Sequence, residues 1–161
     1  VSAMEFVLNG AGSITAAQRQ AMTSSASAKV VADSPDLRAD ADIFAKAIVW
    51  ALRYDTALQA ADVAAITKAQ DRMAQRAGEL DSKRKPWATK KGKVARGFIS
   101  SVDGSTQPYG VIIPRSYDGT KAMRLDVVLH GSSKPVGMSE LKFISRFDEG
   151  DEDKGNVLGV D

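Results

Sequence analysis

The stretch VARGFISSVDGSTQPYGVIIP, residues 94 to 114, predicts a β-hairpin and sets the expected fold class. Two strand-like runs, 94–101 and 108–114, flank the turn sequence VDGS at 102–105. An Asp-Gly pair between two such runs is a strong hairpin signal. The first eighty residues contain one proline, Pro35, and their alanines fall at helical spacing. The chain is therefore expected to change from helical to strand structure near residues 81–92.

Three helices are predicted before the hairpin. Thr15 and Gln18 form a capping box for the first. Ser34 as N-cap, Pro35 in the first turn and Asp36 against the helix dipole begin a second helix that runs to about residue 54. The apolar arc of this helix is wide and suggests burial on more than one side; it comprises Leu37, Ala41, Ile43, Phe44, Ala47, Ile48, Trp50, Leu52 and Tyr54.

The third helix is expected to follow a second capping box, Thr56 with Gln59, and to pack on the second as an antiparallel hairpin. Its apolar face comprises Ile66, Ala69, Met73, Ala77 and Leu80. The chain then divides into a helical N-terminal region, 1–82, a basic linker, 83–93, and a strand-containing region, 94–161.

Beyond the hairpin, residues 116–121 (SYDGTK) are expected to turn, and RLDVVLH at 124–130 to form a third strand buried on both faces. The chain's only histidine, His130, ends that strand and is followed by Gly131, Ser132 and Ser133. Residues 139–147 predict a short helix with Leu141 and Ile144 on one side. The acidic, glycine-rich tail from Asp148 onward is expected to be a surface loop.

This order of hairpin, turn, buried strand and His-Gly loop resembles the opening of the α/β-hydrolase domain, in bacterial esterases and peptidases of the prolyl-oligopeptidase and polyhydroxyalkanoate-depolymerase kind. The resemblance covers about residues 94 to 147. The stretch DADIFAKAIVWALRYD and the later KPW are similar to an N-terminal extension of some of those enzymes. The resemblance implies an α/β fold in which a helix hairpin precedes the first strands of a hydrolase-type sheet, a sheet that is incomplete in this chain.

The resemblance also implies a site. Attack on an ester or amide carbonyl creates an oxyanion, and losing one fixed backbone N–H donor costs roughly 100- to 1000-fold in rate. In the family, the loop after this strand supplies one such donor. The expected donors here are the N–H groups of Gly131, Ser132 and Ser133, and His130 is expected to be structural. The alternative is a buried strand that needs a glycine to turn, with His130 bonded to nearby backbone.

The rest of a serine-hydrolase site is not found in the sequence. No G-x-S-x-G nucleophile motif occurs, and GMSEL at 137–141 comes nearest; its Ser139 is better explained as a helix N-cap. Nucleophile, acid and base are therefore expected beyond Asp161 or on a second, cleaved chain, which would be the partner of this one. The substrate would be a small ester or peptide, with no cofactor and no metal.

The charge distribution suggests other functions. Seven basic and no acidic residues lie between Lys83 and Arg96, with Trp87 among them, which could bind nucleic acid or be a solvated linker. The net charge of only +2 gives no long-range electrostatic attraction for nucleic acid and disfavours that function. The acidic run 148–153 could offer oxygens to Ca²⁺ but fits no EF-hand spacing. A non-catalytic module, in which the helix hairpin docks a partner, would also explain the missing triad.

Composition restricts the remaining classes. The sequence has no cysteine, which excludes disulfides and thiolate metal sites and leaves cytoplasm and periplasm both open. No apolar stretch approaches the roughly 20 residues of a membrane-spanning helix, so a soluble protein is expected. The chain starts at Val1 without signal-peptide features, so any signal is expected to have been removed or never present, and both termini resemble cuts in a longer protein.

Overall fold

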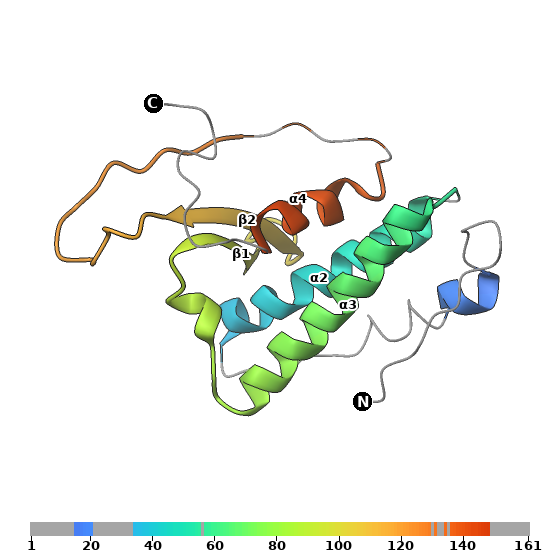
Figure 1. Cartoon of the computed structure of the whole chain (residues 1–161), viewed down its shortest axis with the longest axis horizontal. Helices are drawn as coiled ribbons and strands as arrows, with labels where there is room; N and C mark the ends of the chain where they lie inside the picture. The colour runs from blue at the N-terminus through green and yellow to red at the C-terminus, as the bar shows by residue number, and fades with distance from the viewer. Residues whose placement is uncertain are drawn as a thin grey trace.

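The structure is a computed structural model that describes residues 15–20, 34–55, 57–129, 131, 134 and 136–148. After a helical segment at residues 16–20, the elements follow in the order α2 (Pro35–Tyr54), α3 (Ala60–Asp81), the 3₁₀ helix η1 (Pro86–Ala88), β1 (Gly92–Ile99), β2 (Thr106–Ile113) and α4 (Ser139–Asp148). The fold therefore combines helices with a two-stranded antiparallel sheet, as expected at the level of a small α/β unit (Figure 1).

Local signals explain most helix starts. The predicted capping box at the first helical segment is confirmed, because the Gln18 N–H donates to Thr15 Oγ1 at 3.1 Å and the Thr15 N–H to Gln18 Oε1 at 2.8 Å. Ser34 is the N-cap of α2, although its side chain makes no capping hydrogen bond. The α3 cap is Gln59, whose N–H donates to the Asp62 carboxylate at 3.0 Å. The capping box is therefore Gln59 with Asp62, and the predicted pair of Thr56 with Gln59 is wrong; Thr56 itself lies outside the described residues.

Helices α2 and α3 run antiparallel and side by side, as predicted (Figure 1). The expectation that the wide apolar arc of α2 is covered on more than one side holds only over part of its length. Ile43 and Ala47 are fully buried, whereas Trp50 and Tyr54 are 42% and 56% exposed. The two rings instead pack edge-to-face on each other, 5.3 Å between centroids.

The β-hairpin forms in the predicted place, with Ala95 opposite Gly110 and Gly97 opposite Pro108. Gly104 in the connecting turn has φ +71°, a left-handed conformation that glycine adopts without strain. Small residues let the hairpin approach the helices closely. A Cβ on Gly97 would lie 2.3 Å from the Ala39 carbonyl oxygen, and one on Gly110 would lie 2.5 Å from the Phe147 ring.

One hydrophobic core joins these elements. Its buried residues come from α2, α3, β1 and α4 and from the loop residues Leu58 and Met138, so side chains on both sides of the basic segment share it. The predicted helix at 139–147 is confirmed as α4, and its Leu141 and Ile144 are buried as expected. The largest fully buried side chains are Phe44, Ile43, Ile48, Ile66, Met138, Leu141 and Ile144.

The predicted third strand is wrong for this structure. Residues 121–129 are exposed and belong to no strand, and the sheet of the described residues contains β1 and β2 alone. The physical reason is that a strand satisfies its backbone N–H and C=O groups only by pairing with a neighbour. Within the part of the chain that is described, no strand pairs with this segment. In Figure 1 it is the orange trace that returns from the tip beyond β2 toward α4.

Candidate functional site

The proposed oxyanion donors lie in the connection between β2 and α4. Of the four residues singled out there, the structure describes only Gly131, which is exposed and has no regular structure. His130, Ser132 and Ser133 lie outside the described residues. The structure describes the two flanks of this loop, residues 123–129 before it and residues 134 and 136–140 after it.

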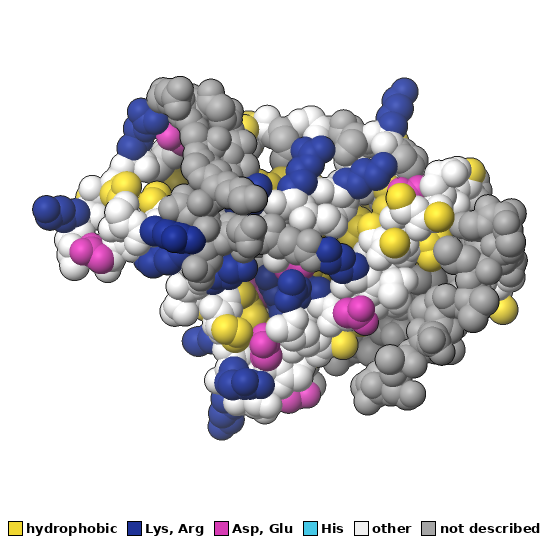
Figure 2. Space-filling model, in the orientation of Figure 1, with side chains coloured by type: hydrophobic (Ala, Val, Ile, Leu, Met, Phe, Trp, Pro, Cys, Tyr) yellow, Lys and Arg dark blue, Asp and Glu magenta, His cyan; other side chains and the backbone are white. Residues whose placement is uncertain are grey.

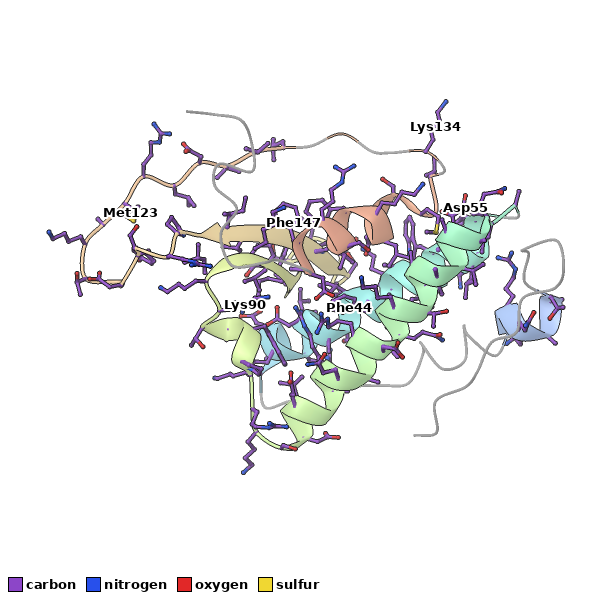
Figure 3. The ribbon with its side chains drawn as sticks, in the orientation of Figure 1. Phe44, Asp55, Lys90, Met123, Lys134 and Phe147 are labelled. Atoms are coloured by element: carbon purple, nitrogen blue, oxygen red, sulfur yellow. The ribbon has the colours of Figure 1, made fainter. Side chains whose placement is uncertain are left out.

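The segment before the loop, residues 123–129, is called here the apolar segment. It exposes large hydrophobic side chains, with Leu125 at 84% and Leu129 at 92%. The remaining apolar members are Met123, Val127 and Val128. The segment also holds an exposed Arg124–Asp126 ion pair, 2.9 Å from Nη2 to Oδ2. Figure 3 places Met123 at the end of the molecule far from Asp55. Contiguous exposed apolar surface on a soluble domain usually marks a contact surface.

The segment after the loop packs on the helices from Gly137 onward, whereas Lys134 and Val136 are exposed. Met138 is fully buried in the core. A Cβ on Gly137 would lie 2.6 Å from the Asp55 Oδ2 and 3.0 Å from the Trp50 carbonyl oxygen, so the backbone here touches the C-terminal end of α2. The Lys134 carbonyl accepts a hydrogen bond from Lys142 Nζ at 3.1 Å. The loop therefore follows an exposed segment and is followed by residues that pack against α2.

Ion pairs connect α4 to α2 and α3. Near its N-terminus, Glu140 Oε2 lies 3.1 Å from Lys46 Nζ of α2, and both side chains are more than 80% buried. At its C-terminus, Asp148 pairs with Arg72 of α3, 2.7 Å from Oδ2 to Nε, and with Arg76, 3.6 Å from Oδ1 to Nη2. Burial raises the pKa of Glu140, and the charge and hydrogen bond of Lys46 oppose that rise.

A buried polar group is centred on Asp40, and we call it the Asp40 cluster: Asp40, Arg76, Trp87 and Arg96. The fully buried Asp40 carboxylate accepts hydrogen bonds from Trp87 Nε1 at 2.8 Å, from Arg96 Nε at 2.9 Å and from the Gly97 N–H at 2.8 Å. It therefore joins α2 to η1 and to β1. Because these donors already bond to it, the carboxylate stabilises the packing of the three elements and does not act as a general base.

Arg76 completes the cluster from α3. Its guanidinium carbon lies 4.9 Å from the ring centroids of both Phe44 and Trp87. Its Nη1 donates to the Asp40 carbonyl at 2.6 Å, and its Nη2 to the Ala95 carbonyl at 2.9 Å. Burial lowers the pKa of Arg76 to about 10, against the opposing charges of Asp148 and Asp40. Such a group remains a cation at neutral pH.

This geometry bears on the basic run between Lys83 and Arg96. Trp87 is buried and hydrogen-bonded to Asp40, so its face is not open to stack on a base. Arg96 is also engaged with Asp40. Figure 2 shows Lys and Arg side chains spread over the face around the hairpin and α4, with Asp and Glu among them. The aromatic part of a nucleic-acid site is thus missing at the predicted place.

Ser139 is the first residue of α4, and the N-cap assignment is wrong by one residue. The Met138 carbonyl accepts the first helical hydrogen bond, from the Lys142 N–H at 2.9 Å. A turn precedes Ser139, whereas a nucleophile elbow joins a strand to a helix. Among the described residues no group of three or more His, Cys, Asp or Glu could hold a metal. The acids 149–153 considered for Ca²⁺ lie outside those residues, and Asp148 is engaged with arginines.

Sequence reasoning missed the Asp40 cluster and the Lys46–Glu140 pair. A signal for the cluster exists: Asp40 stands four residues before Phe44 on an apolar helix face, and Arg76 stands three residues after Met73 on another. A charged residue at such a position is buried only when it is paired. No comparable signal marks Lys46 and Glu140, because their pairing depends on how α4 packs.

Comparison with known proteins adds no relative: no family model matches the chain, and neither a curated protein nor a solved structure matches it. No helix among the described residues has the length and apolar character needed to cross a membrane.

Proposed function

We propose that this chain is the N-terminal part of a serine hydrolase that acts on an ester or peptide bond. In this proposal the apolar segment becomes an interior strand of a larger sheet, whose other strands come from the remainder of the polypeptide or from a second, cleaved chain. The loop after it presents the N–H groups of Gly131, Ser132 and Ser133 to the oxyanion. The nucleophile, acid and base are supplied by the added polypeptide, and His130 is structural.

The observation that carries the proposal is the exposure of the apolar segment directly before the His-Gly loop. Leu125, Val127 and Leu129 alternate along the chain, so in an extended strand they would share one face. Fully burying each such side chain stabilises by about 1.5–3 kcal/mol. A neighbouring sheet would provide that burial and would pair the backbone. The resemblance in sequence order also implies an interior hydrolase strand at this same point of the chain.

The test is active-site labelling with a fluorophosphonate probe, which reacts with activated serines. We expect the isolated chain to stay unlabelled and the complete protein, or the complex of the two chains, to be labelled on a serine outside residues 1–161. A Ser139→Ala variant of the complete protein serves as control and should label as the parent does. Labelling of Ser139, or no labelling of the complete protein, would contradict the proposal.

A specific observation favours a second candidate, the non-catalytic interaction module. The helices and the hairpin share one core, so the folded part has its own hydrophobic interior. Hydrogen exchange distinguishes the two candidates. The hydrolase proposal predicts that amides 124–129 exchange slowly in the complete protein and fast in the isolated chain, whereas the module predicts fast exchange in both.

A further inference from the structure

We infer that the apolar segment pairs with the free edge of β2 when the larger sheet forms, so that it becomes the third strand of an antiparallel sheet after β1 and β2. This inference rests on the proposed function, because it names one neighbour of the strand that the proposal puts inside that sheet. It is carried by the hydrogen bonds at the two edges of the hairpin, by the course of residues 114–123 and by the faces of the strands.

The outer edge of β1 is already occupied by side chains from the helices. The Gly97 N–H donates to Asp40 Oδ1 at 2.8 Å, and the Ala95 carbonyl accepts a hydrogen bond from Arg76 Nη2 at 2.9 Å. These are main-chain groups that a further strand would need for pairing. A strand added beside β1 would have to displace the Asp40 cluster, so the sheet is free to grow only on the side of β2.

The outer edge of β2 carries main-chain groups that no described strand pairs. Opposite residues of an antiparallel pair alternate between hydrogen-bonded and non-hydrogen-bonded pairs. Ala95 and Gly97 direct their groups to the helices. Their partners Gly110 and Pro108 therefore point away from β1, as does Ile112 by the same alternation. Because the sheet of the described residues consists of β1 and β2 alone, the N–H and C=O groups of Gly110 and Ile112 have no strand partner there.

The link between β2 and the apolar segment reverses the direction of the chain. The Tyr117 N–H donates to the Pro114 carbonyl at 3.0 Å, and the Thr120 N–H donates to Asp118 Oδ1 at 2.9 Å. Gly119 has φ +81°, a left-handed conformation suited to such a turn. The chain then returns from the tip beyond β2 toward α4 (Figure 1). A segment that returns in this way can pair antiparallel with β2 without a long crossover.

The faces of the two strands restrict how they can pair. A Cβ on Gly110 would lie 2.5 Å from the Phe147 ring, so this face of β2 points to α4. The alternating apolar side chains of the segment, which begin at Leu125, are buried when they point to the same face. The register in which each of them lies opposite an apolar residue or a glycine of β2 pairs Leu125 with Ile112.

The composition of the segment explains why it is unpaired in the isolated chain. Val128 would point to the face opposite that of Leu125, so the strand is apolar on both faces. Docked on β2 alone, it would expose one of these faces and leave its second edge unpaired. A further strand and its covering elements, supplied by the added polypeptide, remove both costs. Pairing with β2 therefore accompanies completion of the sheet.

The test is disulfide cross-linking of Ile112→Cys with Leu125→Cys in the complete protein. Residues 1–161 contain no cysteine, so a disulfide within this chain can come only from the introduced pair. Opposite residues of an antiparallel pair lie about 4.5–5.5 Å apart between Cα atoms, which a disulfide can span. We expect cross-linking to be about tenfold faster in the complete protein than in the isolated chain, as measured by mass spectrometry of the linked peptides.

The matched control is Ile112→Cys with Asp126→Cys. Asp126 would point to the opposite face, so this pair should cross-link about tenfold more slowly than the pair with Leu125→Cys. Equal rates for the two pairs, or for the complete protein and the isolated chain, would overturn the inference. Hydrogen exchange needs no variant: the Gly110 and Ile112 amides should exchange slowly in the complete protein, and fast exchange there would also overturn it.

Fluorophosphonate labelling of the same samples separates this inference from the proposed function. A disulfide between positions 112 and 125 in a complete protein that no probe labels would refute the hydrolase and leave the pairing with β2 standing. Labelling of a serine outside residues 1–161 without the disulfide would refute the pairing and leave the hydrolase standing.

Discussion

Asp40 is the residue whose substitution should cost the most stability. Replacing it with alanine leaves the Trp87 and Gly97 N–H groups without their acceptor and Arg96 without its counter-charge. Breaking a buried ion pair from one side costs about 3–5 kcal/mol, so the variant should lose most of the stability of a small domain. Urea unfolding followed by circular dichroism measures this.

The control for Asp40 is Asp36→Ala in the first turn of the same helix, where the acid is exposed. Its interaction with the helix dipole is worth about 0.3–1 kcal/mol, and the loss should stay within that range. Equal losses of unfolding free energy for the two variants would contradict the stabilising role assigned to the buried Asp40 carboxylate.

Glu140 should make stability depend on pH in a defined direction. Because burial raises its pKa above the ordinary 4.5, the folded state keeps the proton to a higher pH than the unfolded state does. The folded state thus binds more protons in the window above about 4.5, and the free energy of unfolding falls as pH rises through it. Glu140→Gln removes this contribution.

The measurement for Glu140 is urea unfolding of the parent and of Glu140→Gln between about pH 4 and pH 7. The stability of the parent relative to the variant should be higher at the acidic end and should decrease toward neutral pH. A difference that rises with pH would show that the pairing with Lys46 outweighs the burial of the carboxylate.

Between elements, the closest contact is that of β1 with α2 at Gly97. A methyl group there would meet the Ala39 carbonyl oxygen at 2.3 Å, and backbone cannot move away as a flexible side chain would. Overpacking of this kind typically costs 1–3 kcal/mol, and we expect Gly97→Ala to reach about the upper end. Thermal unfolding measures the loss. Gly78→Ala, on an exposed stretch of α3, should be neutral or slightly stabilising, by up to about 1 kcal/mol.

Element by element, what the sequence predicted correctly was encoded locally. The helix starting at Pro35, the hairpin around Asp103–Gly104 and the short helix from Ser139 each have their signals within a few residues. The third strand failed because strand pairing is non-local: the apolar run at 124–129 has strand composition, but composition does not provide a neighbour to pair with. Trp87 was expected in a linker and is buried for a similar reason, since its acceptor Asp40 lies 47 positions earlier.

The candidate site stays a prediction, because His130, Ser132 and Ser133 lie outside the described residues. The contact of Gly137 with Asp55 and Trp50 was not predicted, because that glycine matters only through its neighbours. A glycine has no side chain from which such a contact could be inferred. Sequence order therefore predicted a position for the loop along the chain, and only packing shows the contacts of the residues that follow it.

At the scale of the whole molecule, the chain combines a buried core with a large apolar surface left outside it. The core unites α2, α3, β1 and α4, while Leu125 and Leu129 remain almost fully exposed. Under the proposed function the two properties have one cause: the core is built from this chain, and the apolar segment is reserved for a sheet that other strands complete.

A double substitution, Leu125→Ser with Leu129→Ser, tests whether the apolar segment contributes to the fold of this chain or to the larger sheet. In the isolated chain both side chains are solvated, so we expect the free energy of unfolding to change by less than about 0.5 kcal/mol per site. Under the proposed function, the same substitutions in the complete protein should remove about 3–6 kcal/mol of burial, and activity should be lost through failure to assemble the sheet. Val102→Ser, in the exposed hairpin turn, should be neutral in both proteins. A complete protein that keeps its stability and activity with both leucines replaced would mean that the apolar segment is not an interior strand.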